Sequence, residues 1–153
     1  MRSSTEGRAL TARHGTVVAK VSSERGDVSK QVIHSDAAPA AIGPYSQAIR
    51  AGNTVYLSGQ IGLDPATGNL REGTDAQARQ VFENLRAVAH AAGGGLDDVV
   101  KVTLLLADMA DFTRVNEIMA SFFAKPYPAR ATYQVAALPK GARIEVEAVL
   151  VLS

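Results

Sequence analysis

The stretch VVKVTLLLADMADFTRVNEIMASFF, residues 99–123, contains the two patterns that decide the fold. Its first part, VVKVTLLLA, is mostly aliphatic and β-branched, which is typical of a strand buried in the centre of a sheet. Its second part repeats apolar side chains at helical spacing, at Phe112, Val115, Ile118, Met119, Phe122 and Phe123. This pattern stops before Pro126, because a proline disfavours the helical conformation in the residue that precedes it. The stretch therefore predicts a buried strand followed by an amphipathic helix.

The same two patterns recur on both sides of this stretch. Residues 75–92 carry a second helical stripe, which Thr74 is placed to cap and Gly93 to Gly95 to end. Runs bounded by turn residues predict the remaining strands, at 31–34, at 47–63 around a Gly-Asn turn, at 130–137 and at 143–151. The predicted order is β, β, β, α, β, α, β, β. It corresponds to an α+β fold in which both helices cover one face of a single sheet.

The composition excludes several classes of function. The chain has no cysteine, so disulfides, thiolate nucleophiles and zinc-thiolate sites are excluded. The histidines, His14, His34 and His90, lie far apart, and no histidines or carboxylates have the spacing of a metal site, so no metal is expected. The apolar runs are far shorter than the ~20 residues that a membrane-crossing helix needs.

The charge is divided unevenly along the chain. With 46% hydrophobic and 20% charged residues, the 153-residue chain has the profile of one soluble globular domain. It contains 16 Lys and Arg against 15 Asp and Glu, of which residues 1–30 hold six against three. Residues 31–153 therefore hold ten against twelve, a net charge of −2. Nucleic-acid binding needs a clustered basic face, so this balance argues against RNA or DNA as the main partner.

The first 30 residues differ in character from the rest. They are rich in Ser, Thr and Arg, contain no aromatic residue and show no sustained apolar period, so we expect an N-terminal extension at 1–30 and one domain at 31–153. An Arg- and Ser-rich leader can direct a protein to a mitochondrion or plastid, although Glu6, Glu24 and Asp27 weaken that interpretation. The alternative is a disordered extension or a misassigned start on a cytoplasmic protein.

The last two predicted strands raise the question of what Arg130 contacts. If they form a hairpin in which Leu138 pairs with Arg143, alternation turns Arg130 and Thr132 to the face opposite the helices, together with Glu145. At ~3.3 Å per residue, Arg130 and Glu145 are then about 20 Å apart and cannot pair within one chain. The mixed character of this face predicts a subunit interface that brings Arg130 of one chain near Glu145 of the next. The alternative is that both residues form ordinary solvated or interfacial ion pairs.

Several motifs resemble a known family in their order and spacing. They are GPYSQA (43–48), LSGQIG (57–62), NLRAVAHAAG (84–93), VNEIMASFF (115–123), YPAR (127–130) and VAALPKGARIEVEA (135–148). Over about residues 34–153 the chain is similar to the reactive intermediate deaminase (RidA) family of the YjgF-like superfamily. The resemblance implies a chorismate-mutase-like sheet with two helices on one face, and a homotrimer with active sites between subunits.

The resemblance also implies an activity. Members hydrolyse reactive enamines and imines, such as 2-aminoacrylate and its 2-iminopropanoate tautomer, to 2-keto acids and ammonia, without a cofactor. This is the 2-iminobutanoate/2-iminopropanoate deaminase reaction, a hydrolysis of C–N bonds that serves metabolite damage control. It would make the partners of this protein a small imine or 2-keto acid and two further copies of the chain.

The family's site residues fall on defined positions of this sequence. The resemblance implies catalytic roles for Tyr45, Arg130 and Glu145 and substrate contacts for Arg130, Ser58, Gly59, Asn116 and Thr132. Arg130 would hold the substrate carboxylate through a bidentate pair, and Glu145 would orient or deprotonate the attacking water. Tyr45 would assist proton transfer or close the pocket.

Each of the other assignments has a structural alternative. Tyr45 could only anchor a loop, Ser58 could only end a strand, and Gly59 could only permit a close backbone approach. Asn116 could bond a neighbouring loop. Thr132 stands where many members carry cysteine, so a thiol cannot be essential to this protein.

Two other functions are compatible with the same resemblance. One is a trimeric regulatory protein that holds a 2-keto acid without turnover. The other is a translation-inhibiting ribonuclease, an activity ascribed to some relatives. The net charge of −2 on residues 31–153 makes RNA the weaker of the two ligands.

Overall fold

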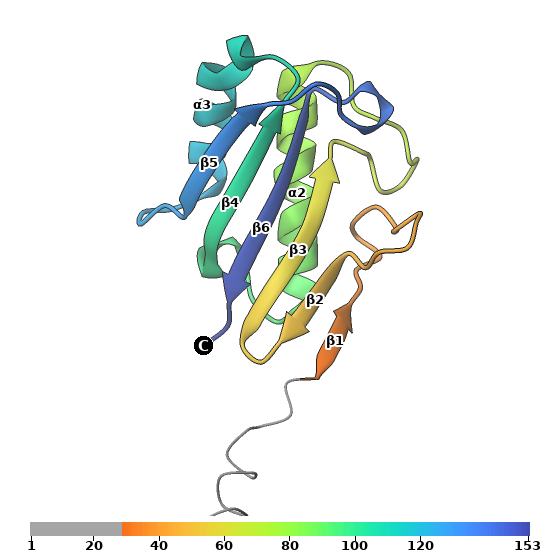
Figure 1. Cartoon of the computed structure of the whole chain (residues 1–153), viewed down its shortest axis with the longest axis vertical. Helices are drawn as coiled ribbons and strands as arrows, with labels where there is room; N and C mark the ends of the chain where they lie inside the picture. Colours follow the sequence, from red (N-terminus) through yellow and green to blue (C-terminus); the bar gives the residue numbers. More distant parts are fainter. Residues whose placement is uncertain (1–28) are drawn as a thin grey trace, which may run out of the picture.

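The computed structural model describes residues 29–153, which form one six-stranded sheet covered on one face by two helices (Figure 1). The strands are β1 (Lys30–Ile33), β2 (Ala48–Ala51), β3 (Thr54–Ile61), β4 (Val99–Leu106), β5 (Ala129–Gln134) and β6 (Ile144–Val151), and the helices are α2 (Thr74–Ala91) and α3 (Phe112–Phe122). The predicted order of elements and the α+β class are confirmed. The interpretation of residues 1–30 falls almost wholly outside the described residues, although β1 already begins at Lys30.

The helices bury the stripes that their spacing predicts. Phe82 of α2 packs against Phe122 and Phe123, with ring centroids 5.4 and 5.8 Å apart. Thr74 does not cap α2 as predicted: Gly73 occupies the cap position, and the Thr74 hydroxyl instead donates to Asp111 Oδ2 at 3.1 Å. Neither helix within residues 29–153 is long and apolar enough to cross a membrane.

The predicted hairpin between the last two strands is wrong. The strand order is β1-β2-β3-β6-β4-β5, so β4 lies between β5 and β6 (Figure 1). The cause is the helical crossover through α3, which returns the chain to the same end of the sheet and makes β5 parallel to β4. The other edge of β4 is then free to pair with β6, which runs antiparallel to both β4 and β3.

This topology reverses the predicted orientation of β5. Arg130 pairs with Val102 and Thr132 with Leu104, and both partners are buried under the helices. Because directly paired residues share a face, Arg130 and Thr132 point to the helical side of the sheet. The prediction that they share the open face with Glu145 is therefore wrong. For Glu145 itself the prediction holds, since it alternates with buried residues of β6.

Contact between the end of β3 and α2 leaves no room for a side chain at Gly62. A Cβ atom there would lie 2.6 Å from Gln77 Cα and 2.8 Å from the Gln77 carbonyl oxygen. Both are backbone atoms, so relief requires α2 to move. The Gln77 side chain in turn donates to the Arg71 carbonyl at 2.9 Å and accepts from the Arg143 amide at 2.7 Å, which ties this helix to two loops.

We therefore predict that Gly62→Ala destabilises the protein by about 1 to 3 kcal/mol, the usual cost of overpacking. Gly95→Ala is the matched control, because its φ of −161° suits any residue and its Cβ would stay 3.8 Å from the nearest atom, in His90. Urea unfolding at one fixed protein concentration measures both variants. Equal unfolding free energies for the two would contradict the close contact.

Candidate active site

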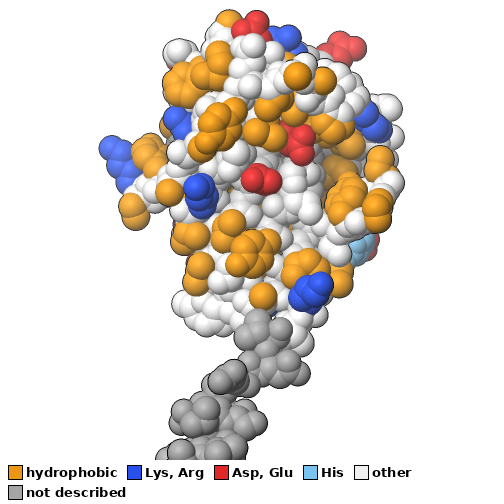
Figure 2. Space-filling view, in the orientation of Figure 1, with side chains coloured by type: hydrophobic (Ala, Val, Ile, Leu, Met, Phe, Trp, Pro, Cys, Tyr) orange, Lys and Arg blue, Asp and Glu red, His pale blue; other side chains and the backbone are white. Residues whose placement is uncertain are grey.

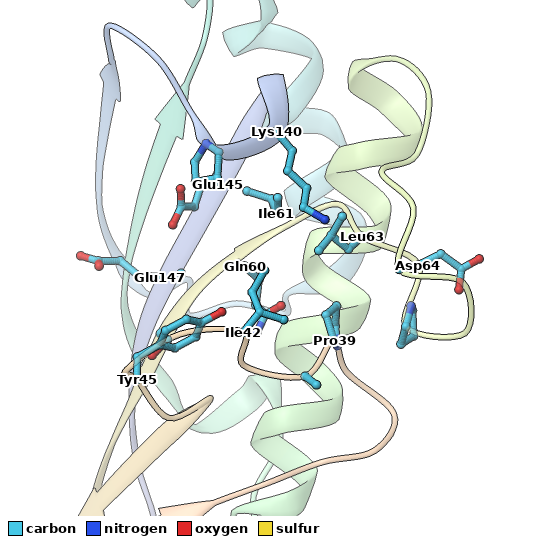
Figure 3. Close-up of a pocket in the computed structure, with 16 residues that line it drawn as sticks. Pro39, Ile42, Tyr45, Gln60, Ile61, Leu63, Asp64, Lys140, Glu145 and Glu147 are labelled. Carbon is cyan, nitrogen blue, oxygen red and sulfur yellow. The ribbon is translucent and has the colours of Figure 1, made fainter.

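A cavity of about 730 Å³ opens between the loop that follows β1, the end of β3 and the start of β6 (Figure 3). It brings together four of the predicted site residues, Tyr45, Ser58, Gly59 and Glu145. Figure 3 shows Tyr45 and Glu145 approaching the cavity from opposite sides. Carboxyl, phenol and hydroxyl groups thus line one concave surface, although they come from three separate parts of the chain.

A β-bulge shapes the floor of this cavity. The pairing of β3 with β6 shifts between Leu57 and Gln60, so that Ser58 and Gly59 together lie opposite Glu147. Such a bulge reverses the side-chain alternation and re-aims the strand. Gln60 consequently faces inward and is 7% exposed. Ser58 is thus in the middle of a strand, and the alternative that it ends a strand is wrong.

Gly59 makes room for the carboxylate of Glu145. A Cβ atom at Gly59 would overlap Glu145 Oε1 and come within 2.9 Å of Glu145 Cδ. The backbone of the bulge and the carboxylate therefore lie close together, and any side chain at this position would have to displace the carboxylate. This is close approach, as the structural alternative proposed, but the approaching group is the candidate catalytic side chain.

The environment of Glu145 changes its proton affinity. Burial raises the pKa of this carboxyl above its usual value, and the negative charge of Glu147, two residues along the same face, raises it further. Within residues 29–153 its side chain has no ion-pair or hydrogen-bond partner. A half-buried carboxylate without a partner is suited to accept and return a proton.

The loop that carries Tyr45 is fastened to β3. The Ser58 hydroxyl donates to the Ser46 carbonyl at 2.6 Å, and the Ser58 amide donates to the Gln47 carbonyl at 3.0 Å. The proton of the Ser58 hydroxyl is thus engaged in holding the loop, while its oxygen can still accept a hydrogen bond. Tyr45 itself is 51% exposed, which leaves its hydroxyl available to a ligand.

Gln47 is a structural residue of the site that the sequence analysis missed. Its side chain is 2% exposed and donates to the carbonyls of Pro39 at 2.8 Å and Ser35 at 3.0 Å, while it accepts from the Ser35 amide at 2.7 Å. It closes the loop from 35 to 47 into one unit. The sequence does contain a signal for this role: Gln47 directly precedes an apolar strand, and a glutamine buried there needs hydrogen-bond partners for its amide group.

Arg130 lines a second cavity of about 340 Å³, on the helical side of the sheet. Its Nη1 donates to Asn116 Oδ1 at 2.6 Å, and its guanidinium lies over the Phe112 ring, 5.4 Å from the centroid. Asn116 therefore orients the arginine from α3, and this partner is a residue of strand β5, not the neighbouring loop of the structural alternative. Nearby, the Thr132 hydroxyl oxygen is buried and has no hydrogen-bond partner within residues 29–153.

The structure therefore separates the seven predicted residues into two groups. Arg130, Asn116 and Thr132 lie on the helical side at the β5 edge, whereas Glu145 lies on the open face across β4. Within the described residues, neither Arg130 nor Glu145 forms an ion pair. No cluster of three or more histidines or carboxylates in residues 29–153 is arranged to hold a metal ion.

Comparison with known proteins identifies the family. A model of the endoribonuclease L-PSP family matches residues 35–152. The human 2-iminobutanoate/2-iminopropanoate deaminase is 53% identical over 123 residues, which cover 80% of this chain and 90% of the human protein. The chloroplastic Reactive Intermediate Deaminase A of Arabidopsis thaliana is 50% identical over 135 residues, 88% of this chain and 72% of the plant protein.

Solved structures agree with the sequence relatives. The crystal structure of RidA from the Antarctic bacterium Psychrobacter sp. PAMC 21119 has a TM-score of 0.79 and 56% identity, and it covers 80% of this chain and 99% of that one. Sequence and fold thus match along almost the whole described region. The chain belongs to the endoribonuclease L-PSP family, the family of the YjgF and RidA proteins.

Proposed function

We propose that this protein hydrolyses 2-imino acids and their enamine tautomers, such as 2-iminopropanoate and 2-aminoacrylate, to 2-keto acids and ammonia. The observation that carries the proposal is the half-buried Glu145 carboxylate, held against Gly59 in a cavity that also contains Tyr45. The names of the human and Arabidopsis relatives, both deaminases at half or more identity, support the same reaction.

The reaction requires four events, and the residues present can perform each one. Arg130 pairs with the substrate carboxylate and fixes the position of the imine carbon. Glu145 takes a proton from a water molecule, whose oxygen bonds to that carbon. The electron pair of the C=N bond moves to the nitrogen, which takes up that proton from Glu145, directly or through Tyr45, to give the carbinolamine. The nitrogen then takes a second proton from Tyr45 or Glu145, while the carbinolamine hydroxyl gives its own proton back to Glu145 or Tyr45. The C–N bond breaks, ammonia leaves, and the carbonyl of the 2-keto acid forms.

Arg130 and Glu145 can act together only if they come from different chains. The open face of the sheet supports such an assembly, because it carries exposed apolar side chains together with central acidic ones (Figure 2). Among them Tyr56 is 54%, Tyr133 58% and Val151 43% exposed. Exposed apolar patches of this kind mark interaction surfaces. The proposal is a homotrimer in which each site combines the Arg130 group of one chain with the Glu145 cavity of the next.

The ribonuclease alternative receives little support from this cavity. Its lining contains the acidic residues Asp64, Glu145 and Glu147 against one cationic residue, Lys140. A phosphodiester backbone binds best where positive charge is concentrated. The alternative of a non-catalytic keto-acid binder is distinguished by turnover, since only an enzyme releases ammonia faster than spontaneous hydrolysis.

The first prediction concerns Arg130. Arg130→Lys keeps the charge and loses the planar fork, so it should be strongly impaired, and Arg130→Ala should lose about 30-fold to 1000-fold in kcat/KM. Keto-acid formation from enzymatically generated 2-aminoacrylate is measured and corrected for spontaneous hydrolysis. Arg86→Ala is the matched control, because its guanidinium also lies over a phenylalanine ring, Phe122 at 5.3 Å, outside both cavities. Near wild-type rates in folded Arg130→Ala would refute the assignment.

The second prediction concerns pH. If Glu145 acts as a base, activity falls as pH decreases through its pKa. Because burial and Glu147 raise that pKa, the acidic limb of the rate–pH profile should lie above pH 4.5, the ordinary pKa of a glutamate. Glu147→Gln should move the limb to lower pH. Glu145→Gln should remove it and lower kcat more than it changes KM. Rates are recorded between about pH 4 and 8, with circular dichroism at each pH. A limb that survives in folded Glu145→Gln would assign it to another group.

The third prediction tests whether sites are shared. Arg130→Ala and Glu145→Gln should each be strongly impaired, but a mixed trimer would retain one site with both residues intact. Equal amounts of the two variants, unfolded and refolded together, should therefore recover about a quarter of the wild-type rate by random assembly. Each variant refolded alone should keep only its own residual rate. Failure of the mixture to regain activity, although mixed trimers form, would rule out a shared site.

A further inference from the structure

Lys140 is the one cationic side chain among the residues that line the larger cavity. Of the acidic residues there, Asp64 is already neutralised, since its Oδ2 lies 3.1 Å from Arg71 Nη2. Within residues 29–153, Lys140 forms neither an ion pair nor a side-chain hydrogen bond. Its ammonium group is therefore available to a ligand, in a cavity whose other charged lining residues are acidic.

The backbone of Lys140 has an uncommon conformation. Lys140 lies in the 3₁₀ turn Pro139–Gly141 with φ 55° and ψ 22°, and it is the only non-glycine residue with positive φ in the described part of the chain. Left-handed backbone is uncommon for lysine and persists where the surrounding structure imposes it, often at ligand sites. Pro139 on one side and Gly141, also at positive φ, on the other hold the turn in this shape.

Lys140 lies apart from the proposed reaction centre, between Glu145 and Asp64 in the view of Figure 3. Figure 3 shows its amine directed into the cavity on the side of Leu63, while the Glu145 carboxylate points the other way. Ile61 lies between these two charged groups in the same view, and Ile42 adds a second apolar side chain to the cavity lining. A cavity of about 730 Å³ is of the size that holds drug-sized ligands, far larger than a three-carbon imino acid requires.

We propose that Lys140 binds an acidic group at the end of the substrate side chain, so that the protein favours 2-imino acids with a second carboxylate, of which the glutamate-derived imine is the type. This inference rests on the proposed function. With the imine carbon at Glu145, the methylene groups follow the apolar wall and the distal carboxylate reaches the ammonium of Lys140. Lys140 is thus a specificity residue and takes no part in the hydrolysis.

The test compares the imines derived from glutamate and from glutamine, which have nearly the same shape and differ in charge. An amino-acid oxidase generates each imine, and semicarbazide traps what the protein has not hydrolysed. The wild type should favour the glutamate-derived imine by about twofold to fivefold, the upper part of the range of an exposed ion pair. Lys140→Met should lose this preference, Lys140→Arg should keep it, and both should hydrolyse the alanine-derived imine within about twofold of wild type.

The results that would overturn the role of Lys140 differ from those that would overturn the proposed hydrolysis. Absence of a preference in the wild type, or equal losses on all three imines in Lys140→Met, would overturn the role of Lys140. Failure of the wild type on the alanine-derived imine would overturn the proposed function instead. In that case, calorimetric binding of 2-oxoglutarate and 2-oxobutanoate still tests Lys140. Lys140→Met should weaken the binding of the diacid 2-oxoglutarate only. If wild type and variant bind each of the two acids equally well, the inference is refuted.

Discussion

The parallel pairing of β5 with β4 is the constraint on which the site depends. It places β4 between β5 and β6 and turns Arg130 to the helical side, where Asn116 and the Phe112 ring hold the guanidinium. Had β5 paired with β6, Arg130 and Glu145 would share a face of one chain. The crossover through α3 separates them across the sheet. A reaction that needs both groups consequently needs two chains, and the edge strand becomes functional because it presents Arg130 outward.

The bulge in β3 has the corresponding role in the other half of the site. It lets the Glu145 carboxylate lie against the backbone of Gly59, and it positions Ser58 to hold the loop that carries Tyr45. Gly59 thus contributes to the burial that raises the pKa of Glu145. Ser58, on the same strand, contributes to the position of the Tyr45 phenol. Such irregularities weaken a sheet ladder locally, and they persist at sites where they aim functional groups.

Charge then decides what the cavity can accept. Burial and the negative charge of Glu147 raise the pKa of Glu145, which suits proton transfer, but the two carboxylates repel an anionic substrate. In the proposed assembly, Arg130 from a neighbouring chain and Lys140 within the cavity would be the two positive charges that offset this repulsion. The distance between them would then select substrates by the distance between their two anionic groups, while the apolar wall would tolerate variation in the side chain.

The sequence by itself determined the element order, the α+β class, the buried stripes of α2 and α3, and the outward position of Glu145, because these follow from local periodicity. The motifs were enough to indicate the family. Only the tertiary structure decided the neighbours of β5 and the face of Arg130, since strand order depends on crossovers that no local pattern records. It also decided the bulge at Ser58 and Gly59, because this register shift arises from the pairing of β3 with β6, which are distant in sequence. The left-handed backbone of Lys140 likewise came from the structure, because lysine does not favour a positive φ.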